Sequence, residues 1–199
     1  MKATLPIYSD LKHENLIELI EAKEIGDGFA MVFKWADSDC MGRMYPAAHR
    51  RFMQLPINDR LAVFSDILSF LECVASRKYV AIDFYDGSIM YDFANGKTTI
   101  CDIDLFHKQP CVNDMGRMWG SSRFQSPEEY QLGADIDEIT NVYTLGATAF
   151  ALFGEYNRTR EKWQLSDKLF EIATRAVSDD RTKRQQSIRQ FTAEWEAAQ

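Results

Sequence analysis

Apolar side chains recur at helical spacing in four segments of the chain, so the pattern predicts four helices. The longest covers residues 57–77, where Asn58 or Asp59 is expected to cap the first turn. Residues 137–153 are apolar on nearly every side and stop at Gly154, which is typical of a helix in the middle of a domain. Shorter helices are predicted after Ser166 and from about residue 185.

The remaining regular patterns predict two β-hairpins, with a short helical stretch before the first. Strands at 19–25 and 29–35 are joined at Gly26-Asp27-Gly28. Strands at 88–93 and 97–101 are joined at Asn95-Gly96, whose residues both tolerate the positive φ of a two-residue turn. Residues 36–53 and 107–125 lack periodicity, so an irregular connector and a long, functional loop are expected there. This order indicates a mostly helical α+β fold.

Composition and charge narrow the class of protein. The chain has 199 residues, of which 46% are hydrophobic and 13% aromatic, values typical of a globular domain. A net charge of -7 disfavours nucleic acid or an anionic membrane as the main partner. No CxxC pair, signal peptide or membrane-spanning apolar run is present, so we expect reduced cysteines and a cytoplasmic protein.

Two carboxylates flank the second predicted hairpin. Asp83 precedes it and Asp102 follows it, so the hairpin should bring the two side chains to one end. Paired carboxylates can bind a hard cation or accept a proton. Acidic residues are also common in ordinary turns, and this pattern alone leaves both interpretations open.

The sequence contains seven motifs, between residues 13 and 184, that resemble those of the eukaryotic-type protein kinase family and follow in the same order. AIDFYDGSIMYD is similar to the family's catalytic loop, CDIDLF stands where the family has D-F-G, and SPEEY is similar to A-P-E. The spacing from Asp83 to Ser88 equals the family's Asp-to-Asn spacing. The other four motifs are HENLIEL, FAMVFKWADSD, TNVYTLGATAFALFG and DDRTKR. The resemblance implies a partial, remnant antiparallel β-sheet N-lobe at residues 1–36 and a mostly helical, kinase-like C-lobe at 37–199.

The resemblance also implies a divergent Ser/Thr kinase-like phosphotransferase that uses ATP and Mg²⁺. Asp83 would be the base that orients the acceptor hydroxyl, Asp102 would hold Mg²⁺, and Ser88 stands at the second magnesium ligand. The implied nucleotide contacts are Phe33 behind the adenine, the backbone of Lys34 to Ala36 at its edge, and Asp37 or Asp39 near the ribose.

The resemblance also concerns residues outside that set. Glu128 and Arg184 should form a buried ion pair, whereas Asn141 departs from the Asp with which the family usually anchors its catalytic loop. Asp86 or Asp104 would either replace the missing Asn as a metal ligand or be solvated.

Several family residues are missing from this sequence. It has no Gly-rich phosphate loop and no V-A-I-K lysine, and Tyr85 replaces the catalytic-loop lysine. We therefore expect transfer to be slow or absent from this polypeptide alone. The alternatives are a catalytically inactive, pseudokinase-like module whose incomplete N-lobe is covered by a protein partner or by self-association, and a longer natural protein. The sequence leaves open whether the acceptor is a protein or a small molecule.

Overall fold

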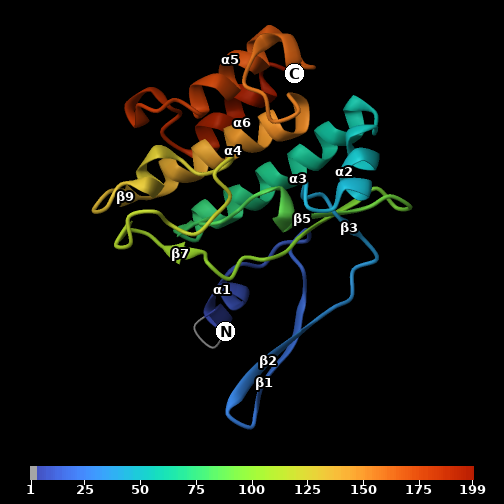
Figure 1. Cartoon of the computed structure of the whole chain (residues 1–199), viewed down its shortest axis with the longest axis vertical. Coiled ribbons are helices and arrows are strands. Elements are labelled where there is room, and N and C mark those ends of the chain that lie inside the picture. The colour runs from blue at the N-terminus through green and yellow to red at the C-terminus, as the bar shows by residue number, and fades with distance from the viewer. Residues whose placement is uncertain (1–3) are drawn as a thin grey trace.

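The computed structural model describes residues 4–199 and shows a mixed α/β fold. Within these residues the helices are α1 (Leu5–Asp10), α2 (Pro46–Met53), α3 (Ile57–Ser76), α4 (Glu138–Phe153), α5 (Asp167–Ala176) and α6 (Ile188–Glu196). The strands are β1 (Leu19–Ile25), β2 (Gly28–Phe33), β3 (Asp39–Cys40), β4 (Tyr79–Val80), β5 (Ile89–Asp92), β6 (Lys97–Ile100), β7 (His107–Lys108), β8 (Cys111–Val112) and β9 (Asp135–Ile136). Helices α2 to α6 form the body, and the hairpin of β1 and β2 extends away from it (Figure 1).

Helix α4 is the centre of the body, as its sequence predicts. Every residue from 140 to 153 is buried, and α3, α5 and α6 all contact the helix. Asp137 caps its first turn by accepting a hydrogen bond from the backbone N–H of Ile139 at 2.8 Å. At Gly146 a Cβ atom would stand 2.6 Å from the Cβ of Ala176, so glycine is what lets α5 approach so closely.

Helix α3 matches its predicted range, but its predicted cap is wrong. Pro56 occupies the N-cap position, and no side-chain cap hydrogen bond is made there. The helix is held instead by its buried face, where the centroids of the Phe64 ring and the Trp195 ring of α6 lie 4.6 Å apart. Packing of this kind stabilises a helix more than one cap does.

The second hairpin forms, but not with the predicted two-residue turn. Asp92 pairs with Lys97, which leaves a loop of residues 93–96 in which Gly96 alone has positive φ. The carboxylate of Asp92 accepts a hydrogen bond from Ala94 N at 2.8 Å, a local turn contact that competes with the tighter turn. Strand β3 adds to the same sheet beside β5, in the order β3-β5-β6.

The two segments predicted to be irregular carry short elements. Residues 36–53 contain β3 and α2, and 107–125 contain β7 and β8, which pair with β4 and β9. Asn113 ties the second segment together, because its side chain donates to Glu128 O at 3.1 Å and accepts from Gly116 N at 3.0 Å. Two-residue strands leave no periodic pattern, which explains why the sequence did not predict them.

Candidate functional site

The two predicted acids lie on neighbouring loops at one end of the β5–β6 hairpin. Asp83 lies between β4 and β5, and Asp102 follows β6 by two residues. Cys101 N donates to Ser88 O at 2.9 Å and so joins the two loops. Both acids have a left-handed backbone, with φ of 61° and 57°. A non-glycine residue in this region carries backbone strain, which clusters at functional sites.

The loop that carries Asp83 is anchored to the central helix. The side-chain oxygen of Asn141 in α4 accepts a hydrogen bond from Ala81 N at 2.7 Å. Its side-chain nitrogen donates to Tyr79 O at 3.0 Å, and both contacts are buried. Asn141 therefore does what the resemblance expects of an Asp at this position, using an amide in place of a carboxylate.

Both acids have a raised pKa, each through desolvation and a neighbouring negative charge. Burial, followed by the negative charge of Asp102, raises the pKa of Asp83 from 3.8 to about 6, although the backbone N–H of Ser121 opposes this by donating to the carboxylate. Asp102 is exposed by its accessible surface, but the protein around it desolvates the carboxylate in part, and this, followed by the charge of Asp104, raises its pKa. A cation bound between carboxylates of this kind would relieve the repulsion.

Ser88 contributes an oxygen without a partner. Its side chain is 0% exposed, and no residue in the described part of the chain hydrogen-bonds its hydroxyl. Leaving a buried hydroxyl without a hydrogen-bond partner costs free energy, which a bound ligand would recover. The Ser88 hydroxyl, on the loop joined to that of Asp102, is therefore a candidate ligand atom.

Asp86 has a structural role that the sequence did not predict. Its buried carboxylate accepts hydrogen bonds from Arg43 N at 3.1 Å, Arg123 Nη2 at 3.1 Å and the Tyr156 hydroxyl at 2.6 Å. It is therefore not solvated, and its oxygens are already engaged. Arg123 and Tyr156 belong to loops far from Asp86 in the sequence, with no pattern that links them.

Asp104 is also engaged. The hydroxyl of Tyr8 in α1 donates to its carboxylate at 3.0 Å. This contact ties the short N-terminal helix to the loop that carries Asp102. Asp104 is therefore half-buried, with one carboxylate oxygen engaged by Tyr8.

Three of the residues predicted to contact a nucleotide line one cleft, and two do not. Phe33, at the end of β2, packs on the Tyr8 ring with centroids 5.1 Å apart. A cleft of about 480 Å³ is lined by Lys34, Ala36 and Asp37 together with residues 8, 11–14, 16–19, 35, 38, 92, 97 and 99. Neither the acids Asp83 and Asp102 nor Ser88 lines this cleft. Asp39 lies in β3, where its Oδ2 is 3.9 Å from Nη1 of Arg51.

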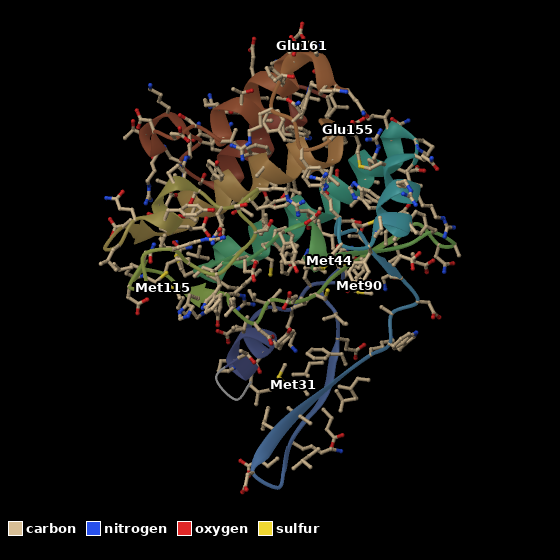
Figure 2. All side chains as sticks on the ribbon, in the orientation of Figure 1. Met31, Met44, Met90, Met115, Glu155 and Glu161 are labelled. Atoms are coloured by element: carbon tan, nitrogen blue, oxygen red, sulfur yellow. The ribbon has the colours of Figure 1, made fainter. Side chains whose placement is uncertain are left out.

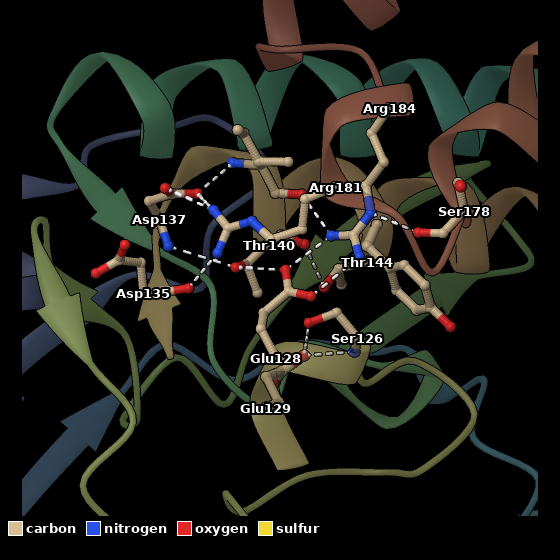
Figure 3. Close-up of polar contacts among 12 residues, drawn as sticks. Ser126, Glu128, Glu129, Asp135, Asp137, Thr140, Thr144, Ser178, Arg181 and Arg184 are labelled. Carbon is tan, nitrogen blue, oxygen red and sulfur yellow. Dashed lines mark hydrogen bonds and ion pairs between the residues drawn. The ribbon is translucent and has the colours of Figure 1, made fainter. Parts of the chain in front are cut away.

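The predicted buried ion pair is confirmed (Figure 3). Arg184 contacts Glu128 through two bonds, Nη1 to Oε1 at 2.7 Å and Nη2 to Oε2 at 2.9 Å. Thr140 donates a third hydrogen bond to Glu128 at 3.0 Å. Burial alone would raise the pKa of Glu128, but the hydrogen bond and charge of Arg184 outweigh it and hold the pKa below its usual value.

Glu129, beside this pair, is a buried acid that sequence analysis missed. It accepts hydrogen bonds from Ser126 N at 2.7 Å and from the Ser126 hydroxyl at 2.9 Å. The Ser-x-x-Glu spacing of a capping box was the signal that could have found it. Burial raises its pKa from 4.5 to about 7.

Comparisons with known proteins name no family for this chain. No family model matches it, and no curated protein matches it in sequence. Among residues 4–199, no group of three or more His, Cys, Asp or Glu side chains is placed to hold a metal ion. No helix of the described residues has the length and apolarity needed to span a membrane.

Proposed function

We propose that this chain is a divergent Ser/Thr protein kinase-like phosphotransferase that uses ATP and Mg²⁺. The observation that carries the proposal is the pair Asp83 and Asp102, held on two joined loops of which one is anchored to α4 by Asn141. The buried pair of Glu128 and Arg184 supports it, because the resemblance predicts that pair from two motifs far apart in the chain.

The donor set fits a magnesium ion of the kind used with nucleotides. Mg²⁺ usually keeps several waters and takes one or two carboxylates plus substrate phosphates, so a cage made entirely of protein is not required. Asp102 would supply the carboxylate, and Ser88, whose backbone oxygen accepts from Cys101 N, has an unpaired hydroxyl on the adjoining loop. An ion bound there would neutralise part of the phosphate charge.

Asp83 would accept the proton of the acceptor hydroxyl. The acceptor hydroxyl oxygen bonds to the γ-phosphorus, the bond from that phosphorus to the bridging oxygen breaks, and ADP leaves with the electron pair. Asp83 takes the hydroxyl proton. A pKa of about 6 makes this carboxylate a better base at neutral pH than an ordinary Asp.

The same site predicts weak activity. Phosphoryl transfer depends on positioning and charge neutralisation, and Tyr85 stands where the family has a lysine. We therefore expect transfer from the isolated chain to be slow.

Thermal unfolding with and without Mg·ATP tests the proposal. Ligand at 100 times its dissociation constant should stabilise the fold by ~2.7 kcal/mol. Asp83→Asn should keep this stabilisation and lose phosphate transfer, whereas Asp102→Asn should lose the stabilisation that Mg²⁺ brings. An unchanged melting temperature in millimolar Mg·ATP, together with no transfer that depends on Asp83, would rule out the proposal.

A second candidate function, a non-catalytic interaction module, is favoured by the β1–β2 hairpin. Ile20, Ile25 and Val32 are 62%, 58% and 40% exposed there. Met31, labelled on the same hairpin in Figure 2, is partly buried and packs against the core, so it does not add to this exposed surface. Within residues 4–199 no third strand joins this sheet, and β2 carries neither a charge nor a proline to protect its edge.

Such an edge accepts a strand from a partner or from a second copy. Sedimentation velocity distinguishes the possibilities. A concentration-dependent dimer that Met31→Pro abolishes would support self-association through β2, and a chain that stays monomeric at all concentrations would contradict it.

A further inference from the structure

Two arginines lie over the Tyr156 ring, and a third, over the neighbouring Tyr143 ring, contacts one of them. The guanidinium carbons of Arg43 and Arg123 lie 5.0 and 4.9 Å from the ring centroid. Arg158 joins them, because its Nη2 donates to the backbone oxygen of Arg123 at 3.3 Å and its Nη1 to the Tyr143 hydroxyl at 2.8 Å. The three come from the segment before α2, the segment before Ser126 and the loop after α4, and we call them the arginine cluster.

The positive charge of the cluster is only partly compensated. Asp86 pairs with Arg123 and also accepts from the backbone N–H of Arg43. Among the described residues, no carboxylate lies within ion-pair distance of the guanidinium of Arg43 or of Arg158, and both side chains are exposed. Two unpaired guanidinium groups therefore face solvent in a protein whose net charge is -7.

The cluster borders the loop of the proposed base. Asp86, which holds Arg123, follows Asp83 by three residues. Ser121, whose backbone N–H contacts the Asp83 carboxylate, precedes Arg123 by two. A polypeptide that placed a hydroxyl at Asp83 would have its neighbouring side chains beside these guanidinium groups.

We propose that the arginine cluster binds an acidic polypeptide segment, which presents a Ser or Thr to Asp83. Arginine suits carboxylates because its planar fork can donate two parallel hydrogen bonds. Each exposed pair contributes little by itself, so the acceptor segment must carry several acids. The binding step stands on the geometry of the cluster, and the acceptor role rests on the proposed function.

Two short peptides test the binding step. They share one serine and differ only in flanking residues, Asp and Glu in one, Asn and Gln in the other. Fluorescence anisotropy with the full chain should show tighter binding of the acidic peptide and weaker binding as salt rises. The double variant Arg43→Gln, Arg158→Gln should bind the acidic peptide about fivefold to tenfold more weakly, with no change for the neutral peptide.

Controls separate a specific site from general charge. Lys168→Gln with Arg189→Gln removes the same charge from exposed positions outside the cluster, and should leave both affinities unchanged. Arg43→Gln alone guards against misfolding, because the guanidinium of Arg43 lies over the Tyr156 ring and makes no hydrogen bond or ion pair within residues 4–199. Equal affinity for the two peptides, an unaffected cluster variant or an equal loss in the control would overturn the proposal.

Stabilisation by Mg·ATP is measured in parallel on the same variants. If the peptides are not distinguished while Mg·ATP still stabilises the chain, the acidic-segment proposal fails and the phosphotransferase proposal stands. If the acidic peptide binds through the cluster while Mg·ATP has no effect, the phosphotransferase proposal fails and the binding of an acidic segment stands.

Discussion

Replacing Asp83 by Asn should stabilise the folded protein at neutral pH. The carboxyl has a pKa of about 6 in the fold, against 3.8 ordinarily, because of burial and the charge of Asp102. The folded state therefore binds more protons than the unfolded chain between these values, so stability falls as pH rises through this range. The difference corresponds to ~3 kcal/mol at pH 7, and partial exposure reduces the expected gain to about 1–2 kcal/mol.

Asparagine suits the position in other respects. It tolerates the left-handed backbone at φ 61° and keeps an oxygen for the N–H of Ser121. A gain of this size should raise the melting temperature by roughly 2–8 °C for a chain of this length.

Urea unfolding followed by tryptophan fluorescence at pH 7 and pH 5 measures the effect. The gain should shrink at pH 5, where the wild-type carboxyl is mostly protonated. Asp27→Asn, in the exposed turn between β1 and β2, is the control and should change stability by less than about 0.5 kcal/mol. A raised pKa at Asp83 is contradicted if Asp83→Asn destabilises the protein, if its gain does not depend on pH, or if the control gains as much.

Three further predictions concern stability. Arg184→Met leaves the Glu128 carboxylate buried without its partner and should cost roughly 3–5 kcal/mol in urea unfolding; a loss below about 1 kcal/mol would contradict a buried pair. Asn141→Ala removes the two hydrogen bonds that hold the loop before Asp83, so the free energy of unfolding should fall by about 2–4 kcal/mol in the same assay. Hydrogen exchange of the Ala81 amide should become faster, and unchanged exchange would refute the anchoring role. The raised pKa of Glu129, about 7, predicts that stability falls between about pH 4.5 and 7, and that Glu129→Gln flattens this part of the pH profile; a variant profile identical to the wild type would disprove it.

Much of the fold follows from periodicity. Helices α3, α4, α5 and α6 have apolar residues at regular intervals, and the Gly26-Asp27-Gly28 turn marks the first hairpin. Short elements could not be predicted, because a two-residue strand such as β3 exists only through its pairing with β5. The four-residue turn depends on a hydrogen bond from Ala94 to Asp92, which a turn motif does not encode.

The candidate site was predictable where motifs carry it. The pair of Glu128 and Arg184 and the anchor at Asn141 came from motif order, which links positions far apart in the chain. The network around Asp86 could not be predicted from motif order, because its partners Arg123 and Tyr156 lie in loops without periodicity. Their contacts arise only when tertiary packing brings the loops together.

The proposed phosphate site is tested most directly by calorimetric titration of ATP into the chain, with and without Mg²⁺. We predict a binding heat that requires Mg²⁺ and is lost in Asp102→Asn, while Asp37→Asn, at the separate 480 Å³ cleft, changes the affinity little. Absence of binding at millimolar Mg·ATP, or equal binding by wild type and Asp102→Asn, would contradict the assignment of Asp83 and Asp102 to a phosphate-transfer site.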